Sequence, residues 1–386
     1  MDFSICFFVA NIHSMIYNKL KSCIKRGASM ENIFYVADFD GNNDDERISA
    51  CLEKASQFEN STVVFANRDF ETSQAILLYS GMTVLIDNCV IRQKNETFDN
   101  VFRSVNVKLN SNNPYASTSP VKPLKDVRIL GKGNAVIEGP TILKKSDSND
   151  IRNRKGYSNG LLENQDMVGC DWGFLAYQIL CVGVDGLEIG GISFVKPKGF
   201  AVTIDLCTHI HVYDIDVNST CKNGDGIHLL SGCSHAIIER ITGTTTDDTV
   251  AVQSGNRLAL LSPMEHFYDT MSKEELSSHH IIIRDVKAGG RYHNVILLPL
   301  NETSIYNVTI ENITDTSRIE PYHATVFLYT GVYGGPGVLR DITVKNIDSL
   351  ADTCFVSNVS IDNLTLSNLI NRSEKGKLYG TYPVKP

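Results

Sequence analysis

The segments Gly186-Leu-Glu-Ile-Gly-Gly-Ile-Ser-Phe194 and His209-Ile-His-Val-Tyr-Asp-Ile-Asp-Val217 are two copies of one pattern in this 386-residue chain. Apolar and polar side chains alternate within each copy, as in a strand that buries one face. Further copies recur along the chain, most of them about 20 to 35 residues apart, and they begin at Ala236, His280, Tyr306, Leu339 and Val359. Units of this kind cannot bury their apolar face alone, so they stack into a solenoid with a continuous core. The repeats predict an all-β fold, a parallel β-helix.

Outside the repeats, one segment shows helical rather than strand periodicity. Residues Asp44–Phe58 place Ile48, Cys51, Leu52 and Ala55 at helical spacing after an acidic start, which predicts an amphipathic helix that caps the open N-terminal end of the core. A polar, helix-like insertion, roughly Asn256–Ser278, widens one repeat gap. We therefore expect residues 30–386 to form a single β-helix domain, and residues 1–29 to be an extension of unknown role.

Composition and charge bear on which partners the protein can bind and on the compartment in which it is located. A net charge of −8 and a pI near 5.7 argue against nucleic acid as a partner. The apolar run near the N-terminus is too short to span a bilayer and lacks the basic start of a secretory signal, so no membrane association is expected. Ten cysteines without zinc-ligand spacing favour a reducing compartment, hence a cytoplasmic location, while nine Asn-x-Ser/Thr sequons leave secretion as the alternative. Oligomeric state stays open.

Carboxylates gather in two neighbouring repeats, Asn223-Gly-Asp-Gly-Ile-His228 and Thr246-Asp-Asp-Thr-Val250. When the second strands of successive coils are aligned, Asp225 falls over Asp248 and then over His293, with Asp247 beside them. Asp247 and Asp248 can both face the groove only if the chain bends or bulges there, because consecutive strand residues point to opposite faces. Clustered carboxylates cannot all ionise freely, so at least one should have a raised pKa and act as a general acid in glycosidic cleavage. The competing explanation is that Asn, Gly and Asp are turn formers.

The order NGDGIH, TDD and a histidine-containing strand resembles glycoside hydrolase family 28, the polygalacturonases, in which NTDGIH or NTDGID, GDD, GHG and RIK lie on a right-handed parallel β-helix of the pectin lyase-like type. The resemblance covers about Gly131 to Thr330. It implies an inverting hydrolase without metal or other cofactor, in which Asp247 is the general acid, Asp225 and Asp248 hold and deprotonate water, Asn223 is the supporting amide and His293 is the family histidine. Inversion by a pair of carboxylates implies a separation of roughly 6.5–9.5 Å between them.

The chain departs from the family where the substrate carboxylate is bound. The RIK position reads Phe327-Leu328-Tyr329, so the lysine has no counterpart. Arg257 or Arg291 could substitute for it, and a neutral or differently decorated sugar is equally compatible. The remaining candidates for contact with a carbohydrate substrate are His228, His323 and Tyr329.

Two other functions fit the same fold. A polysaccharide lyase would use the aspartates to bind Ca²⁺ and a basic residue to remove a proton from a uronate. A non-catalytic glycan-binding β-helix would need no carboxylate cluster. The histidine in the aligned column favours the hydrolase, acting on a pectin-type or related poly- or oligosaccharide.

Overall fold

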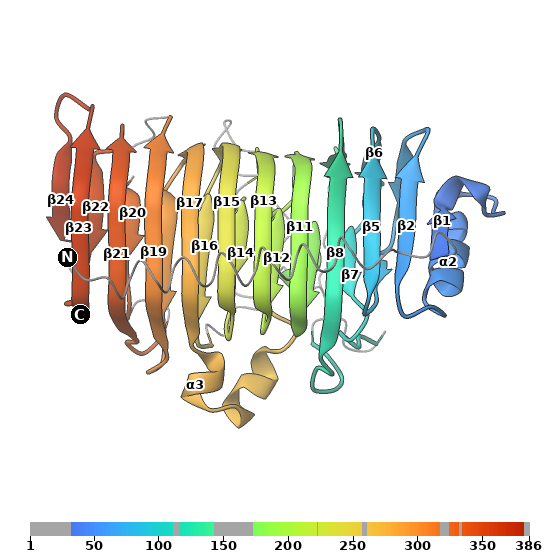
Figure 1. Ribbon diagram of the computed structural model, residues 1–386, viewed down its shortest axis with the longest axis horizontal. Coiled ribbons are helices and arrows are strands. Elements are labelled where there is room, and N and C mark those ends of the chain that lie inside the picture. The colour runs from blue at the N-terminus through green and yellow to red at the C-terminus, as the bar shows by residue number, and fades with distance from the viewer. Residues whose placement is uncertain are drawn as a thin grey trace.

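The computed structural model describes residues 32–110, 116–142, 173–221, 223–256, 261–316, 324–331 and 334–381. The predicted extension, residues 1–29, lies outside this part. Two parallel sheets are wound around one elongated core, and their strands follow one another along its axis from the N-terminal helix to the last coil (Figure 1). The predicted fold, a right-handed parallel β-helix, is confirmed.

The two sheets differ in the lengths of their strands. Among the described residues, the 14-stranded sheet contains β1 Ile33–Tyr35, β2 Ser61–Ala66, β3 Phe70–Thr72, β5 Met82–Asp87, β6 Val90–Gln93, β8 Leu124–Lys132, β9 Val136–Glu138, β11 Val184–Val195, β13 Thr208–Asn218, β15 Ser234–Thr245, β17 Ser278–Gly290, β19 Ser304–Asp315, β21 Val338–Ser349 and β23 Asp362–Asn371. The 10-stranded sheet contains β4 Ile76–Leu78, β7 Phe102–Ser104, β10 Ile179–Val182, β12 Val202–Asp205, β14 Ile227–Leu229, β16 Val250–Ser254, β18 His293–Pro299, β20 Ala324–Leu328, β22 Thr353–Ser357 and β24 Lys377–Thr381. Short 3-10 turns cover η2 Val36–Asp38, η4 Phe174–Ala176 and η5 Glu265–Thr270.

The predicted repeats stack in register. Equivalent apolar residues of β11 to β21 pair from strand to strand and are buried in one continuous core: Ile189, Val212, Ile238, Ile283, Ile310 and Val344. Cys207 and Cys233 precede the paired residues Thr208 and Ser234 and so occupy matching positions on successive coils. Both are buried free thiols, as is Cys181 on β10. Burial raises the pKa of Cys181 to about 12, as expected for structural thiols in an apolar interior.

The N-terminal helix is α2, Asp44–Ala55, and it caps the core as predicted (Figure 1). Its start is fixed by Asn43, whose side chain accepts a hydrogen bond from the Glu46 N–H. The four apolar positions identified from the sequence are its buried face and join the main core. No helix of the described residues is long and apolar enough to cross a bilayer.

Each of the long strands β19, β21 and β23 contains two residues with a positive φ, and the second of the two marks a corner. In β19, β21 and β23 this residue is Asn312 (φ 57°), Asn346 (φ 57°) and Asn368 (φ 51°). The three form a ladder, in which the Asn346 amide donates to Asn312 Oδ1 at 3.0 Å and the Asn368 amide donates to Asn346 Oδ1 at 2.9 Å. Asparagine suits the position because it tolerates the left-handed region and its amide can both donate and accept.

The ladder gives a prediction for stability. Asn346→Ala should lower the free energy of unfolding by about 2 kcal/mol, because it removes both ladder hydrogen bonds and places a Cβ without compensation in the left-handed region. Asn346→Gly should lose less, since glycine adopts this φ freely. Urea unfolding monitored by circular dichroism compares the two variants. Equal losses in both would contradict the conformational part of this explanation.

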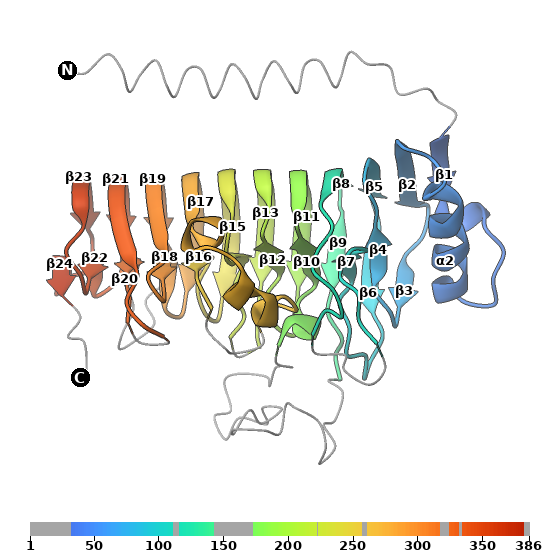
Figure 2. The ribbon, with the colours of Figure 1, turned by 90° about the horizontal axis from the view of Figure 1, so that it is seen from below.

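The insertion between β16 and β17 is held against the 10-stranded sheet by an apolar cluster and by hydrogen bonds to one buried carboxylate. Its described part contains η5 and α3, Lys273–Leu276, and lies below the long strands in Figure 1 and in front of the coils of β12 to β16 in Figure 2. Leu261, Met264 and Tyr268 pack in a separate cluster with residues of that sheet. The buried carboxylate of Asp205 accepts hydrogen bonds from the Ser262 hydroxyl and from Tyr268 Oη, the latter at 2.7 Å. Burial raises the pKa of Asp205 to about 7.

The raised pKa makes stability depend on pH. Because the folded state holds this proton more tightly than the unfolded state, the contribution of Asp205 is fully present below its ordinary pKa and is lost as the pH rises through about 7. The expected slope is at most about 1.4 kcal/mol per pH unit. Asp205→Asn should remove this component, so that the variant gains stability relative to wild type between pH 5 and pH 8 in urea unfolding. A constant difference across that range would show that Asp205 does not titrate there.

Candidate active site

The predicted column of Asp225, Asp248 and His293 is present in the register of the 10-stranded sheet. Ile227, Val250 and Val295 pair across β14, β16 and β18. Immediately before these positions, the Gly226 N–H donates to the Asp248 carbonyl and the Thr249 N–H donates to the His293 carbonyl, both at 2.9 Å. Parallel pairing continues through these positions, so the three side chains occupy equivalent sites on successive coils.

Asp247 and Asp248 both reach the groove because the chain bends between β15 and β16. Thr246 and Asp247 form the bend, which is braced by the Thr245 hydroxyl donating to the Asp247 carbonyl at 2.9 Å. Thr246 also links this turn to the preceding coil, since its Oγ1 donates to the Cys221 carbonyl and accepts from the Gly224 N–H at 3.2 Å. The bend required by the sequence is therefore found, and both aspartates line the same cavity.

The three carboxylates converge on one point. One oxygen from each of Asp225, Asp247 and Asp248 lies within 4.8 Å of the others. The separation of 6.5–9.5 Å expected from the resemblance is not found between these oxygens, which approach more closely. Asp225 is almost fully buried at 2% exposure, whereas Asp247 and Asp248 are half-buried. The cluster is thus open to solvent on the side of the two adjacent aspartates.

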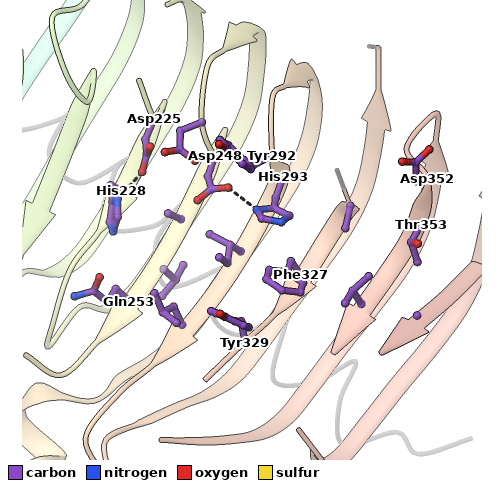
Figure 3. A pocket seen from close by; sticks show the side chains of 18 of the residues that line it. Asp225, His228, Asp248, Gln253, Tyr292, His293, Phe327, Tyr329, Asp352 and Thr353 are labelled. Atoms are coloured by element: carbon purple, nitrogen blue, oxygen red, sulfur yellow. Dashed lines mark hydrogen bonds and ion pairs between the residues drawn. The ribbon is translucent and has the colours of Figure 1, made fainter. Parts of the chain in front are cut away.

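Two histidines orient two of the carboxylates (Figure 3). His228 Nδ1 lies 2.7 Å from Asp225 Oδ2, and His293 Nδ1 lies 2.6 Å from Asp248 Oδ1. Each imidazole is held by ring stacking in turn, His228 on Phe200 at 4.8 Å between centroids and His293 on Phe327 at 4.6 Å. These contacts fix the direction in which each carboxylate faces the cavity.

The cavity has a volume of about 800 Å³ and runs from Phe200 along the coils to β24. Of the predicted substrate-binding residues, Asn223, His228 and Tyr329 line it. Arg291 is not among the lining residues; it lies at the turn before β18, where its N–H donates to the Thr245 carbonyl. Arg257 and His323 lie outside the described residues.

Several lining residues were not identified from the sequence, namely Phe200, Gln253, Tyr292, Asp352, Thr353, Lys377 and Tyr379. Extending the aligned column would have found three of them. One coil before Asp225 the column contains Phe200, and beyond His293 it continues through Ala324 and Thr353 to Lys377. The strands of the last two coils pair over only a few residues, so their sequences carry little periodic signal.

The carboxylate cluster has the composition of a site for a hard divalent cation. Ca²⁺ binds carboxylate oxygens at 2.3–2.6 Å, and oxygens less than 4.8 Å apart can share one such ion. Asp225, Asp247 and Asp248 would hold it, and it would neutralise a uronate in a lyase reaction. That reaction also needs a base beside the cluster, and the lysine among the described lining residues, Lys377, lies three strands beyond β18.

Comparison with known proteins bears on both fold and chemistry. The profile described as glycosyl hydrolases family 28 matches residues 176–264, the segment that contains Asn223 and all three aspartates. The predicted resemblance to glycoside hydrolase family 28 is confirmed. No curated protein sequence matches the chain significantly.

Solved structures show the same fold at low sequence identity. ι-Carrageenase complexed to ι-carrageenan fragments is 11% identical, with a TM-score of 0.60 and coverage of 93% of this chain and 92% of that one. A surface adhesin of Streptococcus pneumoniae is 12% identical, with a TM-score of 0.51 and coverage of 86% and 83%. A polygalacturonase from Erwinia carotovora ssp. carotovora is 15% identical, with a TM-score of 0.49 and coverage of 92% and 96%. The family match supports glycosidase activity on a carbohydrate, and the likenesses to the carrageenase and the adhesin show the fold.

The buried pair of His228 and Asp225 gives a prediction for stability. His228→Asn should lower the free energy of unfolding by about 3 kcal/mol, because the buried Asp225 carboxylate loses its imidazole partner. The matched control is His209→Asn, where the pair with Asp185 is about half exposed and the expected change is below about 0.5 kcal/mol. Chemical unfolding of both variants measures the difference. Similar values would mean that burial does not strengthen the His228–Asp225 contact.

Proposed function

We propose that this protein is a glycoside hydrolase that cleaves a pectin-type or related poly- or oligosaccharide with inversion at the anomeric carbon. The observation that carries the proposal is the convergence of three carboxylates, two of them oriented by histidines, in an open cavity. Carboxylate pairs in such positions supply acid–base catalysis of glycosidic cleavage. The family match over the aspartate-bearing segment supports the same reaction class.

The proposed roles follow the resemblance. Protonated Asp247 gives its proton to the glycosidic oxygen as the bond from that oxygen to the anomeric carbon breaks. A water held by Asp225 and Asp248 attacks the carbon from the opposite face and passes its proton to one of these carboxylates. Two oxygens that each hydrogen-bond one water at about 2.8 Å lie about 4.6 Å apart for a tetrahedral angle. The observed limit of 4.8 Å therefore suits a shared water between Asp225 and Asp248.

The decisive variant is Asp247→Asn, which keeps the shape of the side chain and removes the proton donor. We expect kcat to fall by about 10²- to 10⁴-fold. Product analysis would follow new reducing ends from a panel of pectic and neutral oligosaccharides, with and without EDTA. Undiminished activity in this variant would overturn the assignment of Asp247, and circular dichroism verifies that the variant is folded.

The stereochemical outcome is measured separately. Proton NMR immediately after cleavage shows whether the new reducing end has the opposite anomeric configuration to the substrate. Retention would exclude single displacement and give one aspartate the role of nucleophile, for which the close approach of the carboxylates would be the structural basis.

The Ca²⁺-dependent lyase is the second candidate, and the convergent aspartates are the observation in its favour. It predicts an EDTA-sensitive reaction whose product absorbs in the ultraviolet because of a new carbon–carbon double bond. The hydrolase predicts no such absorbance and no effect of chelator. A non-catalytic glycan-binding protein predicts no product from any substrate, and glycan binding that survives Asp247→Asn.

A further inference from the structure

The floor of the cavity beyond His293 is apolar, although it lies on the outer face of the β-helix. Ile296, Phe327 and Val356 occupy equivalent positions on β18, β20 and β22. Their neighbours on either side, Val295, Leu297, Val326 and Leu328, face the main core. The outward residues therefore form an apolar cluster of their own, where a solvated sheet face would carry polar residues. All three line the cavity.

Aromatic rings continue this floor directly from the candidate catalytic histidine (Figure 3). Phe327 stacks on His293 with 12° between the ring planes, and Tyr329 stacks on Phe327 at 4.8 Å with 27° between the planes. The three rings thus form a contiguous surface that starts beside the Asp248 carboxylate. Because His293 and Tyr329 cover the two faces of Phe327, the stacked rings present their edges to the cavity, which supply apolar area at fixed geometry, and the tyrosine adds a hydroxyl for orientation.

A charged group would be poorly accommodated on this floor. A carboxylate placed over Ile296, Ala324 and Phe327 would lose water without gaining an oppositely charged partner among the lining residues that the structure describes, which is costly. Among the described lining residues, the cation is Lys377 on β24. Three strand spacings separate β24 from β18, or about 14 Å. Lys377 is therefore too far away to neutralise a carboxylate that lies beside His293.

We propose that Phe327 and Tyr329 form the sugar-binding platform next to the cleaved bond, and that the sugar bound there is uncharged. This inference rests on the proposed hydrolase function and names its substrate class: a neutral glycan, or a pectic chain whose carboxylate is esterified at that position. The edges of Phe327 and Tyr329 that face the cavity contact the apolar part of the sugar, and the two aromatics stand in place of the basic residues that an acidic sugar would require.

Binding of matched oligosaccharides tests the proposal without requiring turnover. The probes are oligogalacturonides of one length, either fully methyl-esterified or as free acids, together with a neutral galactooligosaccharide. Isothermal titration with the Asp247→Asn protein measures their affinities. We expect a neutral probe to bind at least about 10-fold more tightly than the free acid. A preference for the free acid, or no binding of any probe, would overturn the proposal.

Phe327→Lys, introduced into the same background, tests the platform itself. It should weaken binding of the neutral probe by about 10-fold and improve binding of the free acid. Thr343→Lys on the opposite sheet is the matched control, because it adds the same charge away from the cavity. An equal effect of both substitutions would mean that the added positive charge acts regardless of its position. That result would overturn the proposal that Phe327 belongs to the sugar-binding platform.

If Phe327→Lys does not fold, Tyr329→Ala takes its place and should weaken neutral binding, whereas Tyr329→Phe should retain most of it. Unchanged binding in Tyr329→Ala would contradict the proposal. Failure of the proposed hydrolase function has a different signature: neutral probes would bind with the expected preference, yet the wild-type protein would release no reducing ends from them.

Discussion

The parallel pairing of β14, β16 and β18 is the constraint on which the candidate site depends. Strand spacing in a sheet is about 4.8 Å, so residues at one register position stand side by side however far apart they lie in sequence. Asp225, Asp248 and His293 are neighbours for this reason alone. A register shift of one residue in β16 would direct Asp248 to the other face of the sheet and leave Asp225 without its companion. Catalytic geometry and core packing are therefore fixed by the same hydrogen bonds.

The bend at Thr246 adds what regular pairing cannot provide. A strand presents every second residue to one face, whereas the site uses two consecutive aspartates. The side chains of Thr245 and Thr246 stabilise the bend that brings both aspartates to this face. They donate hydrogen bonds to the Asp247 and Cys221 carbonyls, respectively. The turn before β14 and the turn before β16 are thereby joined, so that Asn223, Asp225 and Asp247 are held by one network rather than by separate loops. Cleavage chemistry needs such fixed relative positions more than it needs any single residue.

Much of this arrangement could be predicted from the sequence, because it depends on periodicity. The stacked isoleucines, the buried face of α2 and the column from Asp225 to His293 all follow from spacing alone. The distance between carboxylate oxygens could not be predicted, because it depends on side-chain rotation and on the width of a bend. Phe200 and Lys377 were missed although they continue the same column, because their strands are short and their neighbours lack a motif. Asp205 was missed because the partners that bury it, Ser262 and Tyr268, come from an insertion with no periodic pattern.

Phe327 links recognition to catalysis in a way that the family pattern does not. Its ring is stacked on His293, whose Nδ1 contacts Asp248, and it also forms the apolar floor beside that carboxylate. In the proposed function, a sugar bound beside Phe327 would exclude water from the carboxylate cluster, which strengthens electrostatic interactions there. A lysine at this position would recruit a charged sugar, but it would also place a competing cation near the carboxylates. If the protein is the proposed hydrolase, an aromatic residue in place of a basic one would alter both the sugar that fits and the environment of the carboxylates. Under the proposed function, substrate class and the electrostatics of the carboxylate cluster would therefore depend on the same side chain.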